Sequence, residues 1–461
     1  MTANAINSDA EINDYTQAPD TQSKDLKHIP GLNGIPIAGR LPWMIKDYNG
    51  AIQEHYERFG EVSFLNMGLV KGLLILGPEN YKQIYLDMDR NFSAKMGYMS
   101  SLGYFYRRGL LMRDFEEHRY QRRVFQAAFK NDAMRGYLHM MNPIIKRHIT
   151  GWENEKHFKF FVGIKETLLD VASKVFFGID DLGADARNLN QALTDIAEKG
   201  MMGLIKREIP GLKYNAGMKA KRFADGFISK LIPERRRGNE MDFMSYVVKE
   251  KDDQGNYFSD IDLTEHLTFL MFAAHDTTTS ALSHLVMLLG QHPEWQDRLR
   301  KEAMAIDKEF IDWEDLEKLP DMNNAFLEGL RLYPSVSMMT RRTIRACKFG
   351  GYDVPANTLL FIPPQFNHTM KEYWDEPMKF DPDRWAGDRQ EQKRHPFQFV
   401  GFGGGAHKCI GMHFAQMNAK AFMFQFLRMY RFETKPGYQP WMQAIPMPRP
   451  GDMLPLKLTR L

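Results

Sequence analysis

The sequence predicts a mainly α protein with a small β portion. Apolar residues recur at helical spacing from about residue 115 to about residue 310, interrupted by a few glycines and prolines. Asp262–Leu289 contains neither glycine nor proline, and a helix that is apolar nearly all round in its middle belongs in the centre of a large fold. β-like runs are short and lie outside this region, at about residues 60–77 and 342–365.

The domain organisation follows from the absence of internal breaks in this pattern. The sequence contains no internal repeat and no linker, so residues 29–461 are predicted to form one domain with an α-rich core at about residues 78–335. Residues 1–28 are polar and lack an apolar segment. We therefore expect a disordered N-terminal tail, with neither a signal peptide nor a membrane anchor.

Composition excludes several classes of function. A net charge of +3 on 461 residues predicts no nucleic-acid partner. Cys347 and Cys409 are the only cysteines, too few for a disulfide framework or a zinc site. This cysteine usage predicts a reducing, cytoplasmic setting.

The first quarter of the domain alternates short helices and strands. Proline and glycine make residues 29–36 unsuited to a helix. Beyond them, the spacing predicts a helix at Tyr48–Phe59 and strands at Glu61–Leu69 and Lys71–Leu76. A helix at Glu79–Met88 then leads into the α-rich core.

Three further predicted helices carry candidate functional residues. They are Phe115–Phe129, Asp321–Leu332, and a run from Met412 to about Arg428. Between the last two, β-like runs at Arg342–Phe349 and Thr358–Ile362 alternate with proline-rich coil. The C-terminal third therefore holds part of the predicted sheet.

The cysteine loop, about residues 396–411, joins this coil to the last helix. Its Phe402–Gly411 segment is FGGGAHKCIG, and consecutive glycines permit a tight turn with positive φ. Cys409 is thereby presented just ahead of a helix N-terminus, where a thiolate is favoured over a thiol. A lone thiolate among apolar residues suits a soft or borderline metal, and haem iron is the leading candidate.

Two other interpretations of this loop are open. It could be a glycine turn with an incidental buried cysteine. It could also be a dinucleotide-binding loop, because Gly401-x-Gly403-x-x-Ala406 precedes a helix and Glu433 lies further on. Position argues against a nucleotide, since about 55 residues follow Ala406, too few for the rest of a nucleotide-binding half-domain.

Glu328 and Arg331 lie three residues apart on one predicted helix, so their side chains can meet. Most such pairs are solvated surface pairs. Arg384, in the coil segment Pro382–Trp385, offers a second arginine. A carboxylate held between two arginines would fix that coil against the helix.

A polar segment interrupts the long apolar helix. Thr277–Ser280 are four successive hydroxyl residues, and they follow Asp276. Threonine can bond the carbonyl four residues back and bend a helix, and an acid beside an alcohol is a minimal proton relay. The alternative is a polar notch in a buried helix with no chemical role.

His118 and Arg122 lie on one stripe of the helix predicted at Phe115–Phe129. The alternative for this stripe is a solvated basic face. A second stripe, formed by Arg119, Arg123 and Lys130, is interpreted as such a face.

Together these motifs resemble the cytochrome P-450 family of haem-thiolate monooxygenases, from about Pro30 to the C-terminus. Phe402-x-x-Gly405-x-His407-x-Cys409-x-Gly411 resembles the haem-binding loop. The resemblance implies a fold with a long central helix over haem b and Cys409 as the axial iron ligand. Residues that match other family motifs are Glu328, Arg331 and Arg384 (structural cluster), Asp276 and Thr277 (oxygen activation), and His118, Arg122, Arg341, Phe402, His407 and Gly411 (haem binding).

The departures from the family pattern are few. Ala274 replaces a more usual glycine, and Asp383 and Trp385 replace the commoner glutamate and phenylalanine around Arg384. Asn418 stands where many members have glutamate. His118 occupies a position that is often histidine in soluble bacterial members, which favours that type.

By resemblance the chain is expected to insert one atom of O₂ into a lipophilic small molecule, such as a terpenoid, steroid or fatty chain. Electrons would come from a separate ferredoxin or flavodoxin-like protein and its NAD(P)H reductase, and the protein would act as a monomer. Two alternatives are a peroxide-driven or isomerising haem-thiolate enzyme and a haem-based sensor or carrier. Asp276-Thr277 favours the O₂-dependent enzyme.

The same resemblance predicts where substrate and electron donor bind. The pocket would draw on Met96–Met112, which includes the charged pair Arg107-Arg108, and on Phe269–Ala274, Val336–Thr340 and Ala444–Met447. The donor would dock on a basic surface. That surface would combine Arg119, Arg123, Lys130, Lys393, Arg394 and Lys408.

Overall fold

A computed structural model describes residues 23–179, 184–203, 205–445 and 447–461. The chain divides into two units, each built from three separate segments. The sheet unit contains the described residues up to Gln121, Ser337–Asp375 and Gln392–Lys408, and the helical unit contains Arg122–Val336, Glu376–Glu391 and Cys409–Leu461. The single domain expected for residues 29–461 stays a prediction.

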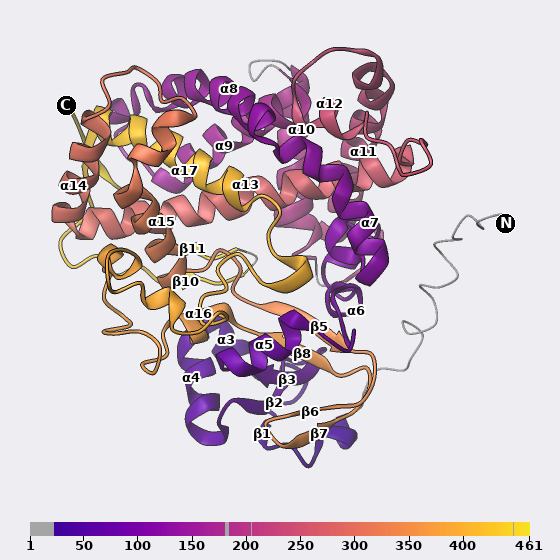
Figure 1. Ribbon diagram of the computed structural model, residues 1–461. Helices are drawn as coiled ribbons and strands as arrows, with labels where there is room; N and C mark the ends of the chain where they lie inside the picture. The colour runs from indigo at the N-terminus through magenta and orange to yellow at the C-terminus, as the bar shows by residue number, and fades with distance from the viewer. Residues whose placement is uncertain (1–22, 180–183, 204, 446) are drawn as a thin grey trace. The chain divides into compact units, whose positions relative to one another are not determined.

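The sheet unit is built around a six-stranded mixed sheet in the order β1-β2-β3-β8-β5-β4. Strands from the N-terminal part of the chain and strands from residues 339–362 meet in it, indigo and orange in Figure 1. β2 and β3 pair antiparallel, whereas β3 and β8 pair parallel with Leu73 opposite Leu360. The strands are β1 (Gly31–Leu32), β2 (Val62–Asn66), β3 (Lys71–Ile75), β4 (Phe92–Ser93), β5 (Met339–Thr343) and β8 (Leu359–Ile362).

Both faces of this sheet are buried at β3. Leu73 and Ile75 belong to one apolar core and Leu74 to another, as the alternation of side chains along a strand requires. Short helices and one hairpin complete the unit: α3 (Leu41–Lys46), α4 (Tyr48–Phe59), α5 (Pro78–Leu86), α6 (Ala94–Tyr98), α16 (Pro364–His368), β6 (Cys347–Phe349) and β7 (Tyr352–Val354).

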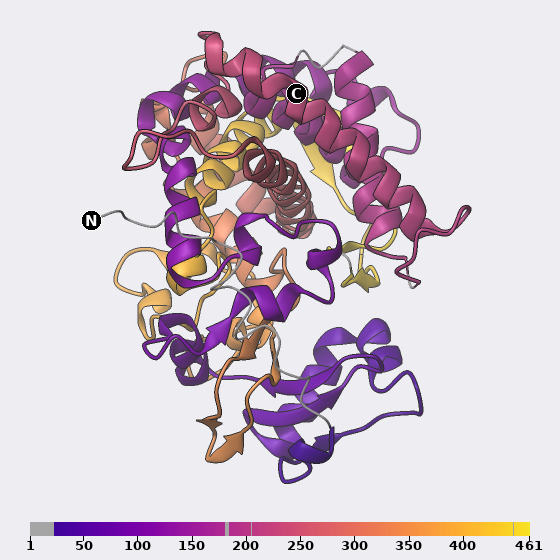
Figure 2. The ribbon, with the colours of Figure 1, turned by 90° about the vertical axis from the view of Figure 1, so that its right-hand side faces the viewer.

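The helical unit is organised around α13 (Asp260–Gln291), which Figure 1 shows lengthwise and Figure 2 nearly end-on. Ser259 caps its start by accepting a hydrogen bond from the backbone N–H of Asp262 at 3.1 Å. The helices that pack against it are α9 (Phe160–Phe177), α11 (Lys213–Arg237), α15 (Pro320–Leu332) and α17 (Met412–Met429). The middle of α13 is therefore buried on most sides, as its composition predicts.

The remaining elements of the helical unit surround α13. α7 (Phe115–Gln126) begins in the sheet unit and ends in the helical unit. The others are α8 (Asn131–Ile149), α9 (Phe160–Phe177), α10 (Ala184–Asp195), which continues as a π-helical turn (Ile196–Gly200), α11 (Lys213–Arg237), α12 (Phe243–Val247), α14 (Pro293–Met304), α15 (Pro320–Leu332), α17 (Met412–Met429), and the pairs β9 (Tyr430–Glu433) with β12 (Lys457–Arg460) and β10 (Met442–Gln443) with β11 (Arg449–Pro450).

Two sequence predictions need correction. The β-like run at Arg342–Phe349 is divided between β5 and β6, because the backbone N–H groups of Ile344 and Arg345 turn aside to bond Asn91 at 2.8 and 2.6 Å. The disordered tail predicted for residues 1–28 extends too far along the chain. Residues 1–22 lie outside the described residues, but Ser23–Leu26 forms a 3₁₀ turn that buries Leu26.

No helix among the described residues is long and apolar enough to span a lipid bilayer.

Candidate functional site

The glycines of the cysteine loop are required by its backbone. Gly403 and Gly405 have φ of 68° and 60°, in the left-handed region that favours glycine. A Cβ on Gly405 would lie 1.7 Å from the carbonyl oxygen of Tyr85. Gly404 is extended, and its Cβ would lie 2.9 Å from the Tyr85 ring. The loop therefore packs too closely on α5 for any side chain.

Residues 394–400, which precede these glycines, form bends, turns and irregular backbone. A dinucleotide-binding loop requires a strand at this point. The local structure therefore does not fit that interpretation.

Cys409 begins the C-terminal segment of the helical unit and is exposed. Gly411 caps α17, so the thiol lies just ahead of the first turn of that helix. Burial lowers the pKa of the half-buried Arg122, and the charge of Cys409 acts in the opposite direction. A helix N-terminus and a nearby guanidinium both favour the thiolate form of Cys409.

In the sheet unit, the structure brings His118 and His407 together. Their ring centroids are 4.0 Å apart, and His118 is buried. Nε2 of His407 lies 3.9 Å from Oδ1 of Asp114, which also accepts the backbone N–H of Ala94 at 2.8 Å. The structure therefore brings together two imidazoles that are 289 positions apart in the sequence.

Arg341 and Phe402 also belong to the sheet unit. Arg341 lies on β5, is buried, and donates from Nη1 to the carbonyl of Thr340 at 2.8 Å. Its backbone packs against α6 at Gly97, where a Cβ would lie 2.7 Å from the Cα of Arg341. Phe402 is partly buried in the cysteine loop.

One face of α13 is accessible within its otherwise buried middle. The partly exposed residues there are Phe269, Leu270, Ala273, Ala274 and Thr277, whose spacing places them on a single stripe. The two alanines give this stripe a shallow surface. Thr277 is its last member and its one hydroxyl group.

Asp276 is buried next to this stripe. Oδ1 lies 3.1 Å from Nε2 of His275. Burial acts to raise the pKa of Asp276, but the charges of His275, Lys165 and Arg449 outweigh burial and lower the pKa. The sequence did not indicate Lys165 or Arg449, because they come from α9 and β11. Asp276 is therefore held as a carboxylate inside the helical unit.

The successive hydroxyls bond backbone carbonyls rather than one another. Thr277, Thr278 and Thr279 donate to the carbonyls four residues back at 2.7, 2.9 and 2.8 Å. The Ser335 hydroxyl donates to the carbonyl of Thr277 at 2.8 Å. These bonds make room for hydroxyl side chains in a helix interior at little cost.

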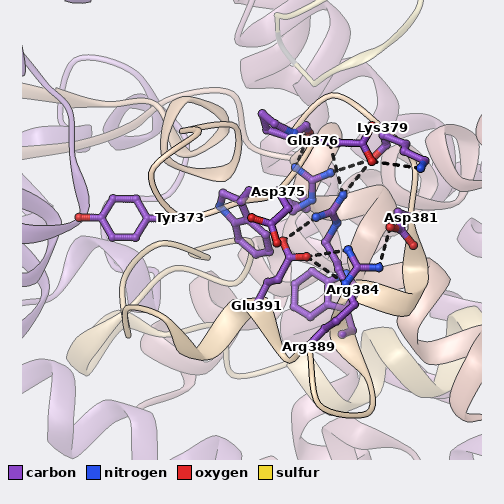
Figure 3. A network of polar contacts seen from close by, with 12 residues as sticks. Tyr373, Asp375, Glu376, Lys379, Asp381, Arg384, Arg389 and Glu391 are labelled. Carbon is purple, nitrogen blue, oxygen red and sulfur yellow. Dashed lines mark hydrogen bonds and ion pairs between the residues drawn. The ribbon is translucent and has the colours of Figure 1, made fainter.

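Glu328, Arg331 and Arg384 form one fully buried ion cluster in the helical unit, part of which Figure 3 shows. Arg331 donates to both oxygens of Glu328 at 2.8 Å, and Nε of Arg384 donates to Oε1 at 3.0 Å. The backbone N–H of Asp381 and the indole N–H of Trp385 add bonds at 3.0 Å each. Trp385 thus supplies a donor that phenylalanine lacks.

The cluster is larger than the sequence indicated. Glu391 is fully buried, accepts from Arg384 at 2.6 Å, and is bonded by Arg389 at 2.6 Å (Figure 3). It begins a short 3₁₀ turn (Glu391–Lys393) seven residues after Arg384, where no periodicity in the sequence marks it. Glu391 keeps the second guanidinium of the cluster from being a buried excess charge.

Much of the basic surface expected to dock an electron donor is paired with carboxylates. Arg119 lies 3.2 Å from Glu116, Arg123 lies 3.2 Å from Asp253, and Arg394 lies 2.7 Å from Asp375. The lysines of this set, Lys130, Lys393 and Lys408, are exposed.

Comparison with known proteins identifies the family. The sequence model described as Cytochrome P450 matches residues 29–456. The chain therefore belongs to the cytochrome P450 family.

Individual relatives agree. "Putative cytochrome P450 136" of Mycobacterium tuberculosis is 35% identical over 439 residues, covering 94% of this chain and 89% of that protein. "Beta-amyrin 28-monooxygenase" of Solanum lycopersicum is 28% identical over 356 residues, covering 74% and 73%. The solved structure "Retinoic acid bound cyanobacterial CYP120A1" is similar with a TM-score of 0.83 and 25% identity, covering 94% of this chain and 99% of that one.

The fold class predicted from the sequence is thereby confirmed, and the chain is a haem b protein with monooxygenase activity. The residues near Cys409 fit this cofactor. Cys409 is exposed, and a Cβ placed on the nearby Gly411 would meet no described protein atom within 4 Å, so the described chain leaves space for a flat group in this part of the loop. The thiolate sulfur is the donor that a haem-thiolate centre requires.

Proposed function

We propose that this cytochrome P450 inserts one oxygen atom into a lipophilic isoprenoid, with electrons from a separate redox protein. Cys409 would be the axial ligand of the haem iron, and Asp276 and Thr277 would deliver protons. The observation that carries the proposal is the accessible stripe of α13, which is apolar until it ends at Thr277, with the ionised Asp276 buried next to it.

Basic and imidazole side chains would hold the haem propionates. His118, Arg122, Arg341 and His407 would supply the hydrogen-bond donors and positive charge that carboxylates of this kind require. Phe402 and Gly411 flank the ligand in sequence. When bound, a thiolate-ligated haem supplies the O–O cleavage that makes C–H oxidation possible.

Proton movement is assigned to atoms on α13. The Thr277 hydroxyl donates to the Ala273 carbonyl at 2.7 Å. A hydroxyl has one donor and two acceptor positions, so Oγ1 can accept a proton from one side and release its own to the other. The ionised Asp276 accepts protons from solvent and passes them on, as a general acid–base group does.

The substrate class follows from the stripe. Phe269, Leu270 and two alanines offer apolar contacts and no charge. Beta-amyrin and retinoic acid, which appear in the names of two relatives, are both isoprenoids. The segment Ala444–Met447, also expected to line the pocket, includes residue 446, which lies outside the described residues.

The electron donor is proposed to be a ferredoxin or flavodoxin-like protein with its NAD(P)H reductase. The exposed lysines Lys130 and Lys393 support an acidic partner. We expect the on-rate of docking to fall as salt rises, because salt screens exposed charges.

The proposal is tested by titrating purified protein with a panel of triterpenoids, steroids, retinoids and fatty acids while following the haem spectrum, then measuring NAD(P)H-driven product. An isoprenoid that shifts the spectrum and is hydroxylated supports it. Fatty acids alone as substrates would overturn the substrate class. Equal product from hydrogen peroxide without a reductase would favour the peroxide-driven alternative.

The ligand is tested with a matched pair of variants. Cys409→Ser should abolish the red-shifted band of the reduced carbon monoxide complex, which depends on thiolate. Cys347→Ser should retain the band, because burial raises the pKa of Cys347 to about 11 and it lies in β6. A band retained in Cys409→Ser would remove the ligand assignment.

A further inference from the structure

His275 is a buried imidazole that the proposed reaction has not used. It is 2% exposed and lies on α13 directly before Asp276. Nδ1 lies 2.9 Å from the carbonyl oxygen of Met271. Nε2 lies 3.1 Å from Oδ1 of Asp276, and no described group completes an aligned hydrogen bond with Nε2.

These two contacts determine where the protons of the ring must be. A carbonyl oxygen can only accept, so Nδ1 carries a hydrogen. A neutral ring would then turn the lone pair of Nε2 toward the carboxylate of Asp276, and two acceptors at 3.1 Å repel each other. Buried polar atoms avoid such contacts. A proton on either Nε2 or the carboxyl group removes the repulsion.

We infer that His275 is a positioning residue that stores a proton beside Asp276, so that the His275–Asp276 pair, and not the carboxylate alone, is the immediate proton source for Thr277. This inference rests on the proposed relay through Asp276 and Thr277. It gives His275, the residue before Asp276, a part in supplying protons.

The transfer balances within the pair. The Nε2–H bond breaks and an O–H bond forms on the carboxylate, which turns an imidazolium and a carboxylate into two neutral groups. The carboxyl group then gives its proton toward Thr277, and the ring regains one from solvent water.

The charges around the pair keep the acid ionised at rest. Lys165 on α9 and Arg449 on β11 act on Asp276. Nζ of Lys165 bonds Oε1 of Glu198 at 2.6 Å, and the side chain of Glu198 is 50% exposed. This ion pair reaches the surface of the helical unit and marks the side from which water can restore the proton.

Two substitutions separate the roles of the two ring nitrogens. His275→Asn can keep the donor to the Met271 carbonyl but has nothing in the place of Nε2. His275→Gln can place an N–H near Asp276 but cannot ionise. His284→Asn is the control, since His284 is a fully buried imidazole about two and a half turns further along α13.

The main measurement is NAD(P)H-driven product formation against pH, with hydrogen peroxide quantified. We expect both His275 variants to lose up to about 10²-fold in product rate, the lower end of general acid–base effects, and to release more peroxide. We expect product formation driven by added hydrogen peroxide to be unchanged, because peroxide brings its own protons. If His275 has only a structural role, its variants should lose both the NAD(P)H-driven and the peroxide-driven rate. If His275→Asn equals the wild type in both rates, His275 has no part in proton supply.

A second readout does not depend on turnover. In the ferrous carbon monoxide complex, ¹⁵N NMR of the imidazole should show hydrogens on both ring nitrogens of His275 at neutral pH in the wild type. In Asp276→Asn, the ring should lose its second hydrogen at a lower pH than it does in the wild type. A ring with one hydrogen in both proteins, together with normal activity of His275→Asn, would overturn the inference.

The outcomes also distinguish this inference from the relay on which it rests. If Asp276→Asn and Thr277→Ala divert electrons into peroxide but His275→Asn does not, only the role of His275 fails. If all three variants couple like the wild type, the relay itself fails.

Discussion

The helical unit contains two buried polar regions that are built in opposite ways. Glu328 accepts hydrogen bonds from two arginines, an indole and a backbone N–H, and both arginines bond further acceptors. Among the residues that the structure describes, Asp276 has one close side-chain partner, and the Nε2 atom of that partner has no aligned hydrogen bond. A satisfied network fixes structure, whereas an incompletely satisfied one can gain and lose protons.

The largest predicted effect breaks the satisfied region. Glu328→Ala leaves two guanidinium groups facing each other in the core, and removing one partner of a buried ion cluster costs about 3–5 kcal/mol. We expect apoprotein or aggregate, measured as haem content and thermal unfolding. Asp276→Ala, which removes a carboxylate from the other region, should fold and bind haem. Normal haem content in Glu328→Ala would show that the cluster is dispensable.

A smaller effect tests one bond within the cluster. Trp385→Phe removes the indole N–H that bonds Oε2 of Glu328 at 3.0 Å, and a hydrogen bond to a charged group is worth about 1.5–3 kcal/mol. Trp374→Phe is the matched control, because its indole bonds the neutral carbonyl of Asn367 at 3.0 Å. Unfolding in urea should show the greater loss for Trp385→Phe. Equal losses would contradict the difference between charged and neutral acceptors.

Exposed ion pairs contribute less to stability than the buried ion cluster around Glu328. The side chain of Arg123 is 46% exposed beside Asp253, and such pairs contribute about 0–1 kcal/mol. Arg123→Glu, alone or with Arg119→Glu, should leave the free energy of unfolding nearly unchanged. Stopped-flow reduction by an acidic ferredoxin should slow, most at low salt. Reduction at the wild-type rate would place the docking surface elsewhere.

The smallest effect concerns the pH dependence of Asp276. Its folded-state pKa is lowered, chiefly by His275 against the effect of burial. The ionised form therefore stabilises the fold above the ordinary carboxyl pKa, and this stabilisation is lost as pH falls through the folded pKa. Thermal unfolding of wild type and Asp276→Asn should differ at pH 7 and converge under acid conditions. If the difference in thermal stability grew on acidification, the pKa of Asp276 would be raised in the folded state and not lowered.

The sequence predicts best where local chemistry decides the structure. α4 has the predicted bounds because Asp47 caps its start by accepting the Gly50 N–H at 2.9 Å, and Gly60 ends it at φ 78°. The positive φ values of Gly403 and Gly405 follow in the same way from glycine.

The remainder depends on contacts between distant segments. Nothing near Glu391 in the sequence marks it as the partner of Arg384, and Ser335 bonds the Thr277 carbonyl from 58 residues away. The direction in which the His275 ring points is also a property of the folded chain. Side chains from distant segments decide whether the polar groups around Glu328 and Asp276 are fully hydrogen-bonded. The sequence therefore indicates the two acids, but it does not indicate that one is fully hydrogen-bonded and the other is not.

The central claim is that the α13 region delivers protons, and one ratio tests it most directly. Product formed per NAD(P)H consumed should fall in Thr277→Ala, with the missing electrons recovered as hydrogen peroxide. Thr264→Ala is the control, since Thr264 makes the same kind of bond on the same helix, to the Asp260 carbonyl at 2.7 Å, and should couple like the wild type. If Thr277→Ala couples as well as Thr264→Ala, the hydroxyls of α13 only shape the helix and the account is wrong.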